Sequence, residues 1–212
     1  MGLLDGKVAF VTGAARGQGR SHAIRLAHEG ADIIAIDACA TPDWLSYPLA
    51  TEADLAQTVK DVEALDRRII AEKADIRDYD AVRGVLGEGV AALGGRLDIV
   101  TANAAIISWP QDLWAIDVAE FRELIDVTLT GTFITLKAAV PHMIAAGNGG
   151  SIVLTSSGAA ITAGKGLGDY KAAKNGVLEA VRQLRGTASN QVPGAEVALV
   201  GAPAGSAMIL AR

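Results

Sequence analysis

Lys7–Gly19 reads KVAFVTGAARGQG, and it joins a short apolar run to a glycine-rich turn. The β-branched and apolar run Lys7–Val11 is typical of a buried strand. A helix-like stretch, Ser21–Glu29, follows the turn and ends at Gly30. Strand, glycine turn and helix in this order form a phosphate cradle, because glycine lets the backbone approach a ligand closely and the helix N-terminus offers free N–H donors. Such a turn taken alone is often only a tight bend, so its context decides.

The rest of the chain repeats the succession of strand and helix. Short apolar runs predict further strands at Ala31–Ile36, Arg68–Ala74, Leu97–Thr101 and Ser151–Thr155. Apolar stripes predict helices between them, over a segment ending at Leu65, over Tyr79–Leu93, and over Val118–Met143 with breaks near Gly131 and Pro141. Alternation of this kind predicts an α/β fold, a Rossmann-type doubly wound parallel sheet in three layers with right-handed crossovers.

Ligands of such sheets bind beyond the carboxyl ends of the strands, where several small or polar residues of this chain fall. These are Gly13, Asp37, Asp75, Asn103 and Ser157. Asp37 lies 24 residues after Gly13, where a carboxylate accepts both ribose hydroxyls of an adenosine and repels a 2′-phosphate, which favours NAD over NADP. Asp75 is placed to contact an adenine edge. Arg16 is the contrary indication, since a guanidinium can hold a 2′-phosphate.

Gly164–Gly176, GKGLGDYKAAKNG, places Tyr170 and Lys174 one helical turn apart. Residues at this spacing lie on one helix face about 6 Å apart. A neighbouring lysine cation favours a phenolate and lowers the pKa of a tyrosine, which makes the phenol a better acid and base near neutral pH. Ser157 would add a second hydroxyl at the mouth of the same cleft. On spacing alone, a surface helix pair is the plainer interpretation.

Composition describes an ordinary soluble globular chain. Its 212 residues are 50% hydrophobic and 20% charged, which suits a single domain, and the net charge of −5 argues against a nucleic-acid surface. The single cysteine, Cys39, cannot form an internal disulfide, and no His or Cys group has metal-ligand spacing, so no metal is predicted. We expect a buried structural thiol. Neither a signal peptide nor a membrane span is indicated, so we expect a cytoplasmic protein.

From about Leu4 to Val177 these motifs resemble the short-chain dehydrogenase/reductase family. TGAARGQG is similar to the family's cofactor turn, ANAA to its N-N-A-G segment, and Ser157, Tyr170 and Lys174 to its catalytic residues. The sequence of Gly6–Ala40, together with the long insert after Asp37, also resembles the carveol-dehydrogenase-like branch associated with mycofactocin, whose members are similar in holding NAD tightly. The resemblance implies Tyr170 as general acid and base, Lys174 as the group that lowers its pKa, and Ser157 as a hydrogen-bond donor to the substrate oxygen. The implied cofactor-binding residues are Gly13, Ala15, Arg16, Gly17, Gln18, Gly19, Asp37, Asp75, Ile76, Asn103, Ala104, Tyr170 and Lys174.

Two local departures from the family pattern concern the catalytic cleft. Thr128 stands where the family has a helix asparagine, and a hydroxyl lacks the paired donor and acceptor of an amide. A water-linked proton relay through this position would be impaired. In ANAA, Ala102 removes one amide and Ala105 adds a methyl group, whereas Asn103 remains.

The third departure is the end of the chain, since residues 178–212 resemble a thiolase carboxyl terminus without its catalytic residues. We expect one NAD-binding domain over residues 1–212, dehydrogenase-like over 1–177, with truncated or substituted C-terminal strands. Within this tail Leu178–Leu184 continues a helix, Gly186 can stop it, and Glu196–Val200 is a plausible sixth strand. A half-built substrate pocket and an exposed sheet edge would result.

The leading hypothesis is an NAD-dependent oxidoreductase that interconverts a secondary alcohol, of terpene or steroid type, and its ketone. Its partners would be this small alcohol or ketone and, by family resemblance, further copies of the chain in a dimer or tetramer. Two alternatives stay open: a catalytically impaired NAD-binding protein, and a chimeric or truncated frame without function. Thr128 and the altered tail motivate both.

Overall fold

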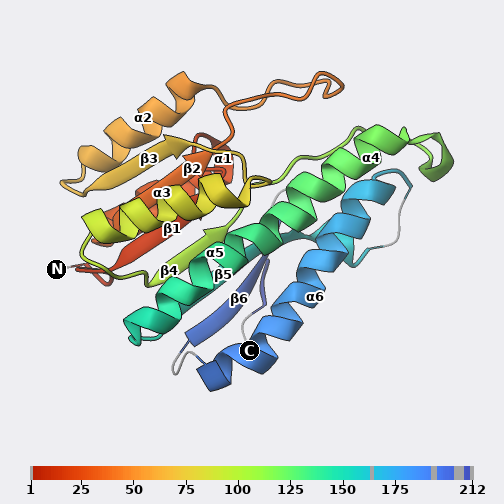
Figure 1. Ribbon diagram of the computed structural model, residues 1–212. Coiled ribbons are helices and arrows are strands. Elements are labelled where there is room, and N and C mark those ends of the chain that lie inside the picture. Colours follow the sequence, from red (N-terminus) through yellow and green to blue (C-terminus); the bar gives the residue numbers. More distant parts are fainter. Residues whose placement is uncertain (1, 163–164, 192–194, 203–207, 211–212) are drawn as a thin grey trace.

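The described part of the chain forms one seven-stranded sheet with helices on both faces (Figure 1). This computed structural model describes residues 2–162, 165–191, 195–202 and 208–210. The strand order is β3-β2-β1-β4-β5-β6-β7, in which every neighbouring pair is parallel except β6 and β7. The strands are β1 (Val8–Thr12), β2 (Asp32–Asp37), β3 (Ile69–Lys73), β4 (Ile99–Ala102), β5 (Gly150–Ser157), β6 (Ala195–Ala202) and β7 (Met208–Leu210).

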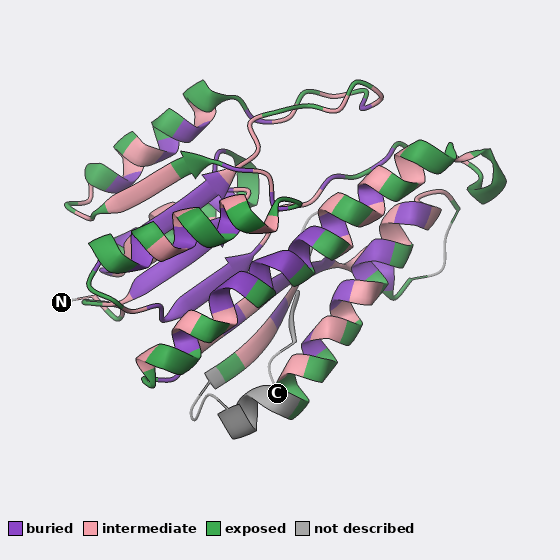
Figure 2. Cartoon of the chain, in the orientation of Figure 1, coloured by how far each residue is buried: buried purple, intermediate pink, exposed green. Residues whose placement is uncertain are grey.

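Two hydrophobic layers hold the helices to the sheet, because alternate residues of each strand point to opposite faces. The longer helices are α1 (Gly17–His28), α2 (Glu52–Glu63), α3 (Tyr79–Ala92), α4 (Val118–Ile125), α5 (Gly131–Ala146) and α6 (Gly168–Gln191). Phe10 and Ile34 pack in the layer that includes α3, α5 and α6, whereas Ala9 and Ile33 pack in the layer with α1 and α2. Figure 2 shows β1 and β4 buried between these layers. The predicted three-layer α/β fold is therefore confirmed.

The predicted break of the long helix at Pro141 is wrong. Helix α5 runs through Pro141 to Ala146, and the irregularity lies earlier, in the π turn η2 (Asp126–Thr130) just before Gly131. A proline inside a helix costs about 3 kcal/mol. Burial of neighbours such as Ala139 and Met143 against the sheet outweighs that cost.

The C-terminal part agrees with the predictions in its strand and departs from them in its helix. Helix α6 continues past Gly186 to Gln191, because an interior glycine costs only about 1 kcal/mol and Arg185 Nε donates a 2.9 Å hydrogen bond to the Val197 carbonyl. Strand β6 lies parallel to β5, at the place predicted for a sixth strand. The likeness of residues 178–212 to thiolase stays a prediction, and 192–194, 203–207 and 211–212 lie outside the described residues.

The helical stretch Val118–Ala146 is long and apolar enough, by length and composition, to cross a membrane. Its inner face, however, includes Leu136, Ala139 and Met143 of the main core, and core helices of soluble proteins commonly pass the same test. The stretch is accordingly a core helix that packs on the sheet.

Candidate active site

The glycine turn after β1 is packed too tightly for side chains on its inner side. A Cβ at Gly19 would lie 1.9 Å from the Gly13 carbonyl oxygen, and one at Gly13 would lie 2.9 Å from the Ala104 Cα. Gly13 and Gly17 have φ angles of 67° and 56°, which suit glycine. A Cβ at Gly17 would meet nothing within 4 Å, so the outer side of the turn is open. The turn therefore exposes backbone at the N-terminus of α1, as a phosphate cradle requires.

A crevice of about 500 Å³ runs along the carboxyl edge of the sheet, from this turn to Tyr170. Most predicted binding residues line it, namely Gly13, Arg16, Gly17, Gln18, Asp37, Asp75, Ile76, Asn103, Ala104 and Tyr170. The other four, Ala15, Gly19, Ser157 and Lys174, are not among the described residues that form its wall. Ala15 and Gly19 are buried beneath the turn, and Lys174 is buried behind Tyr170.

Asp37 stands at the end of β2 and lines the crevice beside the glycine turn. Its Oδ2 accepts a 3.0 Å hydrogen bond from the Ala15 N–H, and its Oδ1 accepts one of 3.0 Å from the Cys39 N–H. Each oxygen keeps a second lone pair for a hydroxyl donor. Arg16 is turned away from this role, since its Nη1 donates a 2.8 Å hydrogen bond to the Pro48 carbonyl. The geometry thus leaves Asp37 as the charged group that a ribose would meet.

Asp75 is engaged by Arg77 at the far side of the crevice. Arg77 Nη2 lies 2.6 Å from Asp75 Oδ2, and Arg77 Nη1 lies 2.9 Å from Glu123 Oε1. Burial acts to raise the pKa of Asp75, but the hydrogen bonds and charge of Arg77 outweigh it and lower that pKa. The predicted adenine contact therefore belongs to an ion-pair network that includes helix α4.

Asn103 holds three strands together at the edge of the crevice. Its Nδ2 donates a 3.1 Å hydrogen bond to the Thr12 carbonyl, its backbone N–H donates to Thr12 Oγ1, and its Oδ1 accepts from Thr155 Oγ1. Asn103 thereby fixes β1, β4 and β5 relative to one another. The predicted contact with a ligand would come from its exposed edge and from the backbone of Ala104.

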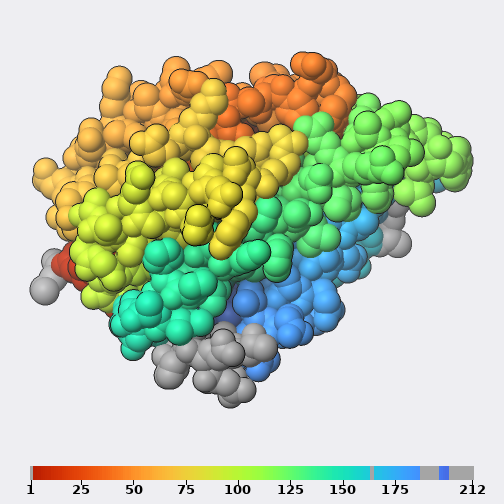
Figure 3. Space-filling view, viewed as in Figure 1, coloured from red at the N-terminus to blue at the C-terminus, as the bar shows by residue number. Residues whose placement is uncertain are grey.

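The loop of residues 38–50, a surface excursion longer than a connection from strand to helix needs, forms one wall of the crevice. Tyr47 OH donates a 2.9 Å hydrogen bond to the Ile107 carbonyl and accepts one from the Ile107 N–H. Trp44 Nε1 donates to Glu123 Oε2 at 2.6 Å. In Figure 3 the orange atoms of this part of the chain meet the green atoms of α4 along the top of the molecule. The unusual length of the excursion was the one sequence signal for this wall.

Ser157, Tyr170 and Lys174 come together, as predicted, at the end of the crevice. Tyr170 is hydrogen bonded to Ser157, at the end of β5. Lys174 is 2% exposed, lies with its Nζ 5.7 Å from the Tyr170 ring centre, and donates a 2.7 Å hydrogen bond to the Thr155 carbonyl. The i, i+4 spacing on α6 and the end of β5 bring the three groups to one place.

The pKa of Tyr170 departs from the prediction in direction. Burial raises it, and the hydrogen bond from Ser157 lowers it by less. Burial also lowers the pKa of Lys174 to about 8. The ammonium is directed at the Thr155 carbonyl rather than at the phenol oxygen, so the expected lowering of the Tyr170 pKa by Lys174 is wrong for the protein alone.

Thr128 replaces part of what the family's asparagine would supply. Its buried hydroxyl donates a 3.3 Å hydrogen bond to the Ile106 carbonyl and accepts a 3.4 Å one from the Ile106 N–H. The Thr128 carbonyl accepts a 2.8 Å bond from Thr132 Oγ1. The π turn therefore remains tied to the loop after β4 in spite of the substitution.

Cys39 is half-buried, and burial with the nearby Asp37 carboxylate raises the pKa of its thiol to about 11, so it is a poor nucleophile at neutral pH. Within the described residues no group of three or more His, Cys, Asp or Glu side chains is arranged to hold a metal ion.

Comparison with known proteins gives the class. The short chain dehydrogenase family matches residues 7–193, and the chain belongs to this family. The (-)-trans-carveol dehydrogenase of Rhodococcus erythropolis is 48% identical over 184 residues, which are 87% of this chain and 66% of that relative. An uncharacterized NAD-dependent oxidoreductase of Mycobacterium tuberculosis is 50% identical over 184 residues, 86% of this chain and 66% of that one.

Among solved structures, the carveol dehydrogenase from Mycobacterium avium in complex with NAD superposes with a TM-score of 0.88 at 48% identity, over 90% of this chain and 69% of that one. A short chain dehydrogenase from Mycobacterium paratuberculosis bound to NAD gives 0.86 at 46% identity, over 90% and 70%. The match covers 66% of the length of each of the two curated relatives, so this chain spans less than two thirds of their length.

Proposed function

We propose that this protein is an NAD-dependent oxidoreductase that interconverts a secondary alcohol and its ketone. The observation that carries the proposal is the position of Tyr170: it lines the same crevice as the glycine turn, with Ser157 hydrogen bonded to it and Lys174 buried behind it. A phenol, a second hydroxyl and a cation at the end of a dinucleotide-sized cleft suit removal of a carbinol proton.

The residues present fit NAD. The inner side of the turn has no room for a Cβ at Gly13 or Gly19, and its outer side is open at Gly17, so pyrophosphate can approach the backbone. Asp37 offers carboxylate oxygens to two ribose hydroxyls and would repel a 2′-phosphate. Two structural neighbours, at 48% and 46% identity, bind NAD. When bound, the nicotinamide accepts the hydride that leaves the carbinol carbon.

The proton is handled by the chain's own groups. Tyr170 takes the hydroxyl proton of the alcohol, and Ser157 holds the same oxygen through its hydroxyl. To accept that proton Tyr170 must start as the phenolate and end as the neutral phenol. Lys174, fixed by the Thr155 carbonyl, supplies positive charge 5.7 Å from the ring centre, which would favour the phenolate before the transfer. In the protein alone, burial raises the pKa of Tyr170, so the phenolate that accepts the proton would have to be favoured by the positive charges that meet it, those of Lys174 and of the nicotinamide of bound NAD.

The substrate we propose is a secondary alcohol on an apolar ring, of the terpene or steroid type. Ile106, Ile107 and Val127 make the wall near Tyr170 apolar, and one relative at 48% identity is a (-)-trans-carveol dehydrogenase. We also propose a cytoplasmic homo-oligomer, dimer or tetramer, which light scattering of the purified chain would test.

Two measurements separate this function from the alternatives. Calorimetry with NAD and NADP is expected to show binding with preference for NAD, and a chain without function would bind neither. Hydride transfer, followed by NADH absorbance on a panel of cyclic secondary alcohols including carveol, is expected to show turnover. Binding of NAD without turnover of any member of the panel would instead indicate a catalytically impaired NAD-binding protein.

A further inference from the structure

Asp169 is a completely buried carboxylate that stands directly before Tyr170 and has no part in the proposed proton transfer. Its Oδ1 accepts a 2.7 Å hydrogen bond from the Ser108 hydroxyl and a 2.8 Å one from the Tyr170 N–H. Its Oδ2 has no hydrogen-bond partner among the described residues. A carboxylate removed from water is unfavourable unless it is paired, and here the two hydrogen bonds to Oδ1 and the position near the N-terminus of α6 offset this.

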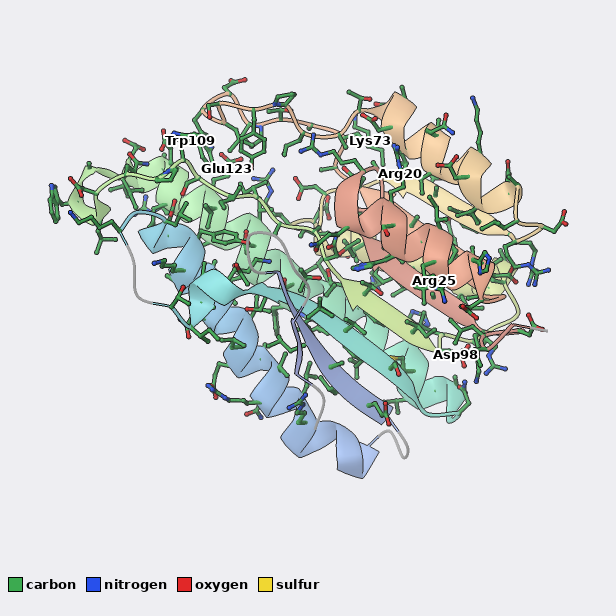
Figure 4. All side chains as sticks on the ribbon, turned by 180° about the vertical axis from the view of Figure 1, so that it is seen from behind. Arg20, Arg25, Lys73, Asp98, Trp109 and Glu123 are labelled. Atoms are coloured by element: carbon green, nitrogen blue, oxygen red, sulfur yellow. The ribbon has the colours of Figure 1, made fainter. Side chains whose placement is uncertain are left out.

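Ser108 belongs to the loop after β4 that forms the apolar wall of the crevice. It is 2% exposed and lies between Ile107, which lines the crevice, and Trp109, which faces solvent. In Figure 4 Trp109 lies on this loop, at the same end of the molecule as Glu123 of α4. The hydrogen bond therefore joins the wall that would contact a substrate to the helix that carries Tyr170, across 61 residues of sequence.

Close packing surrounds this hydrogen bond. A Cβ at Gly168 would lie 2.5 Å from Leu113 Cδ1, and one at Gly166 would lie 2.8 Å from Pro110 Cβ. Gly166 has a φ of 71°, and Leu167 has one of 58°, which is uncommon for a leucine. The turn before α6 is thus shaped to fit the loop that carries Ser108, and Ser108–Asp169 is the polar contact at its centre.

We propose that Ser108 and Asp169 form a positioning pair that fixes the substrate-facing loop relative to the Tyr170 hydroxyl. The proposal rests on the alcohol oxidation proposed above. Neither residue touches the reacting atoms; the pair acts through the loop on one side and Tyr170 on the other. Because misplacement of a substrate by about 1 Å can cost roughly 100-fold in rate, the loss should fall on kcat rather than on NAD affinity.

The kinetic test uses Ser108→Ala, Asp169→Ala and the double variant. Each single variant is expected to lower kcat with the ring alcohol by roughly 10- to 100-fold while the Kd for NAD stays unchanged, and the double variant is expected to be no worse than either. Asp169→Asn keeps an oxygen acceptor for Ser108 and is expected to restore most of the activity. Asp112→Ala, which removes an exposed carboxylate from the same loop, is the matched control and should act like the parent.

Losses that multiply in the double variant, or an Asp169→Asn variant as slow as Asp169→Ala, would overturn the pairing. Hydrogen exchange of the amides in residues 105–112 tests the Ser108–Asp169 pair independently of turnover. Exchange there should speed up in Ser108→Ala and Asp169→Ala and match the parent in Asp169→Asn. If the parent turns over no alcohol, the proposed function is refuted, and the exchange measurement alone then tests the Ser108–Asp169 pair. Unchanged exchange in both Ala variants would refute the pair itself.

Discussion

The ammonium group of Lys174 lies 5.7 Å from the centre of the Tyr170 ring and donates its 2.7 Å hydrogen bond to the Thr155 carbonyl. This cation is held in the core, where burial lowers its pKa from 10.5 to about 8. A buried ammonium therefore lowers the stability of the fold at neutral pH. A catalytic role for Lys174 would explain why such a destabilising group is present.

The pH dependence of the stability difference between the parent and Lys174→Met tests this destabilisation. Because the folded pKa lies below the unfolded value, the penalty is complete below pH 8, is relieved as pH rises between about 8 and 10.5, and is gone above. The stability of the parent relative to Lys174→Met should thus rise by on the order of 3 kcal/mol across that range. Urea unfolding at pH 7 and pH 10.5 measures it, and a difference that does not vary with pH would contradict the buried cation.

Tyr170→Phe removes the proposed acid and base and little else. Turnover should fall by at least about 1,000-fold, because both proton transfer and the hydrogen bond with Ser157 are lost, while the Kd for NAD stays within about twofold. Tyr79→Phe on α3 is the matched control, since its ring lies 4.6 Å from Lys137 Nζ outside the crevice. Equal activity of Tyr170→Phe and parent would remove Tyr170 from the mechanism.

Asp37→Ala should relax the preference for NAD over NADP by roughly 10-fold or more, since the carboxylate both accepts ribose hydroxyls and repels a 2′-phosphate. Calorimetric Kd values for the two nucleotides report the ratio. Arg16→Ala is an informative companion: its guanidinium bonds the Pro48 carbonyl, so the ratio should stay near that of the parent. An unchanged ratio in Asp37→Ala would assign the discrimination to another group.

Tyr47→Phe should loosen the wall formed by residues 38–50. The hydroxyl makes two hydrogen bonds with Ile107, at 2.9 and 3.1 Å, and their loss should speed NAD dissociation by roughly 10-fold. Stopped-flow displacement of bound NAD measures the rate. If that rate is the same as in the parent, the contact between Tyr47 and Ile107 does not govern release.

Asp98→Asn should destabilise the fold by about 2–3 kcal/mol without changing NAD specificity, because it removes the charge from a 3% exposed carboxylate bonded to Lys7 and Arg96. Burial acts to raise the pKa of Asp98, and its hydrogen bonds lower it overall. Its contribution is hence present above the unfolded value of about 3.9 and is lost as pH falls through the lower folded pKa. Asp80→Asn, at an exposed ion pair, is the control for urea unfolding.

The sheet and the site could be read from the sequence where the signal is local. The glycine turn, the carboxylate at the end of β2 and the spacing of Tyr170 and Lys174 each follow from a few neighbouring residues, and the strands beneath them follow from apolar runs. Prolines and glycines were less reliable. A break was expected near Pro141 and a helix end near Gly186, but packing on the sheet carries α5 through Pro141, and α6 continues past Gly186 with Arg185 bonded to the Val197 carbonyl.

Contacts between distant segments could not be read in the same way. Tyr47 meets Ile107 and Ser108 meets Asp169 only after the sheet has formed, and no periodicity marks such pairs. The direction of the Tyr170 pKa shift could not be predicted either. Burial raises this pKa more than the hydrogen bond with Ser157 lowers it, and the spacing of residues in the sequence does not reveal burial. The two hydrogen bonds of Thr128 with the Ile106 backbone are a further example of a contact between distant segments, and the predicted impairment of a proton relay through Thr128 stays a prediction.

Two of the chain's three tryptophans, Trp44 and Trp109, line a small second hollow between the loop of residues 38–50 and the loop after β4, and Trp114 lies on the short helix Leu113–Ala115. Trp44 is anchored to Glu123, whereas Trp109 and Trp114 are 73% and 86% exposed. Since none of the three is buried, the tryptophan emission of the native protein comes from its surface, and two of the three emitters lie on loops that also line the crevice. Arrival and departure of a small molecule can be timed optically on the unlabelled chain.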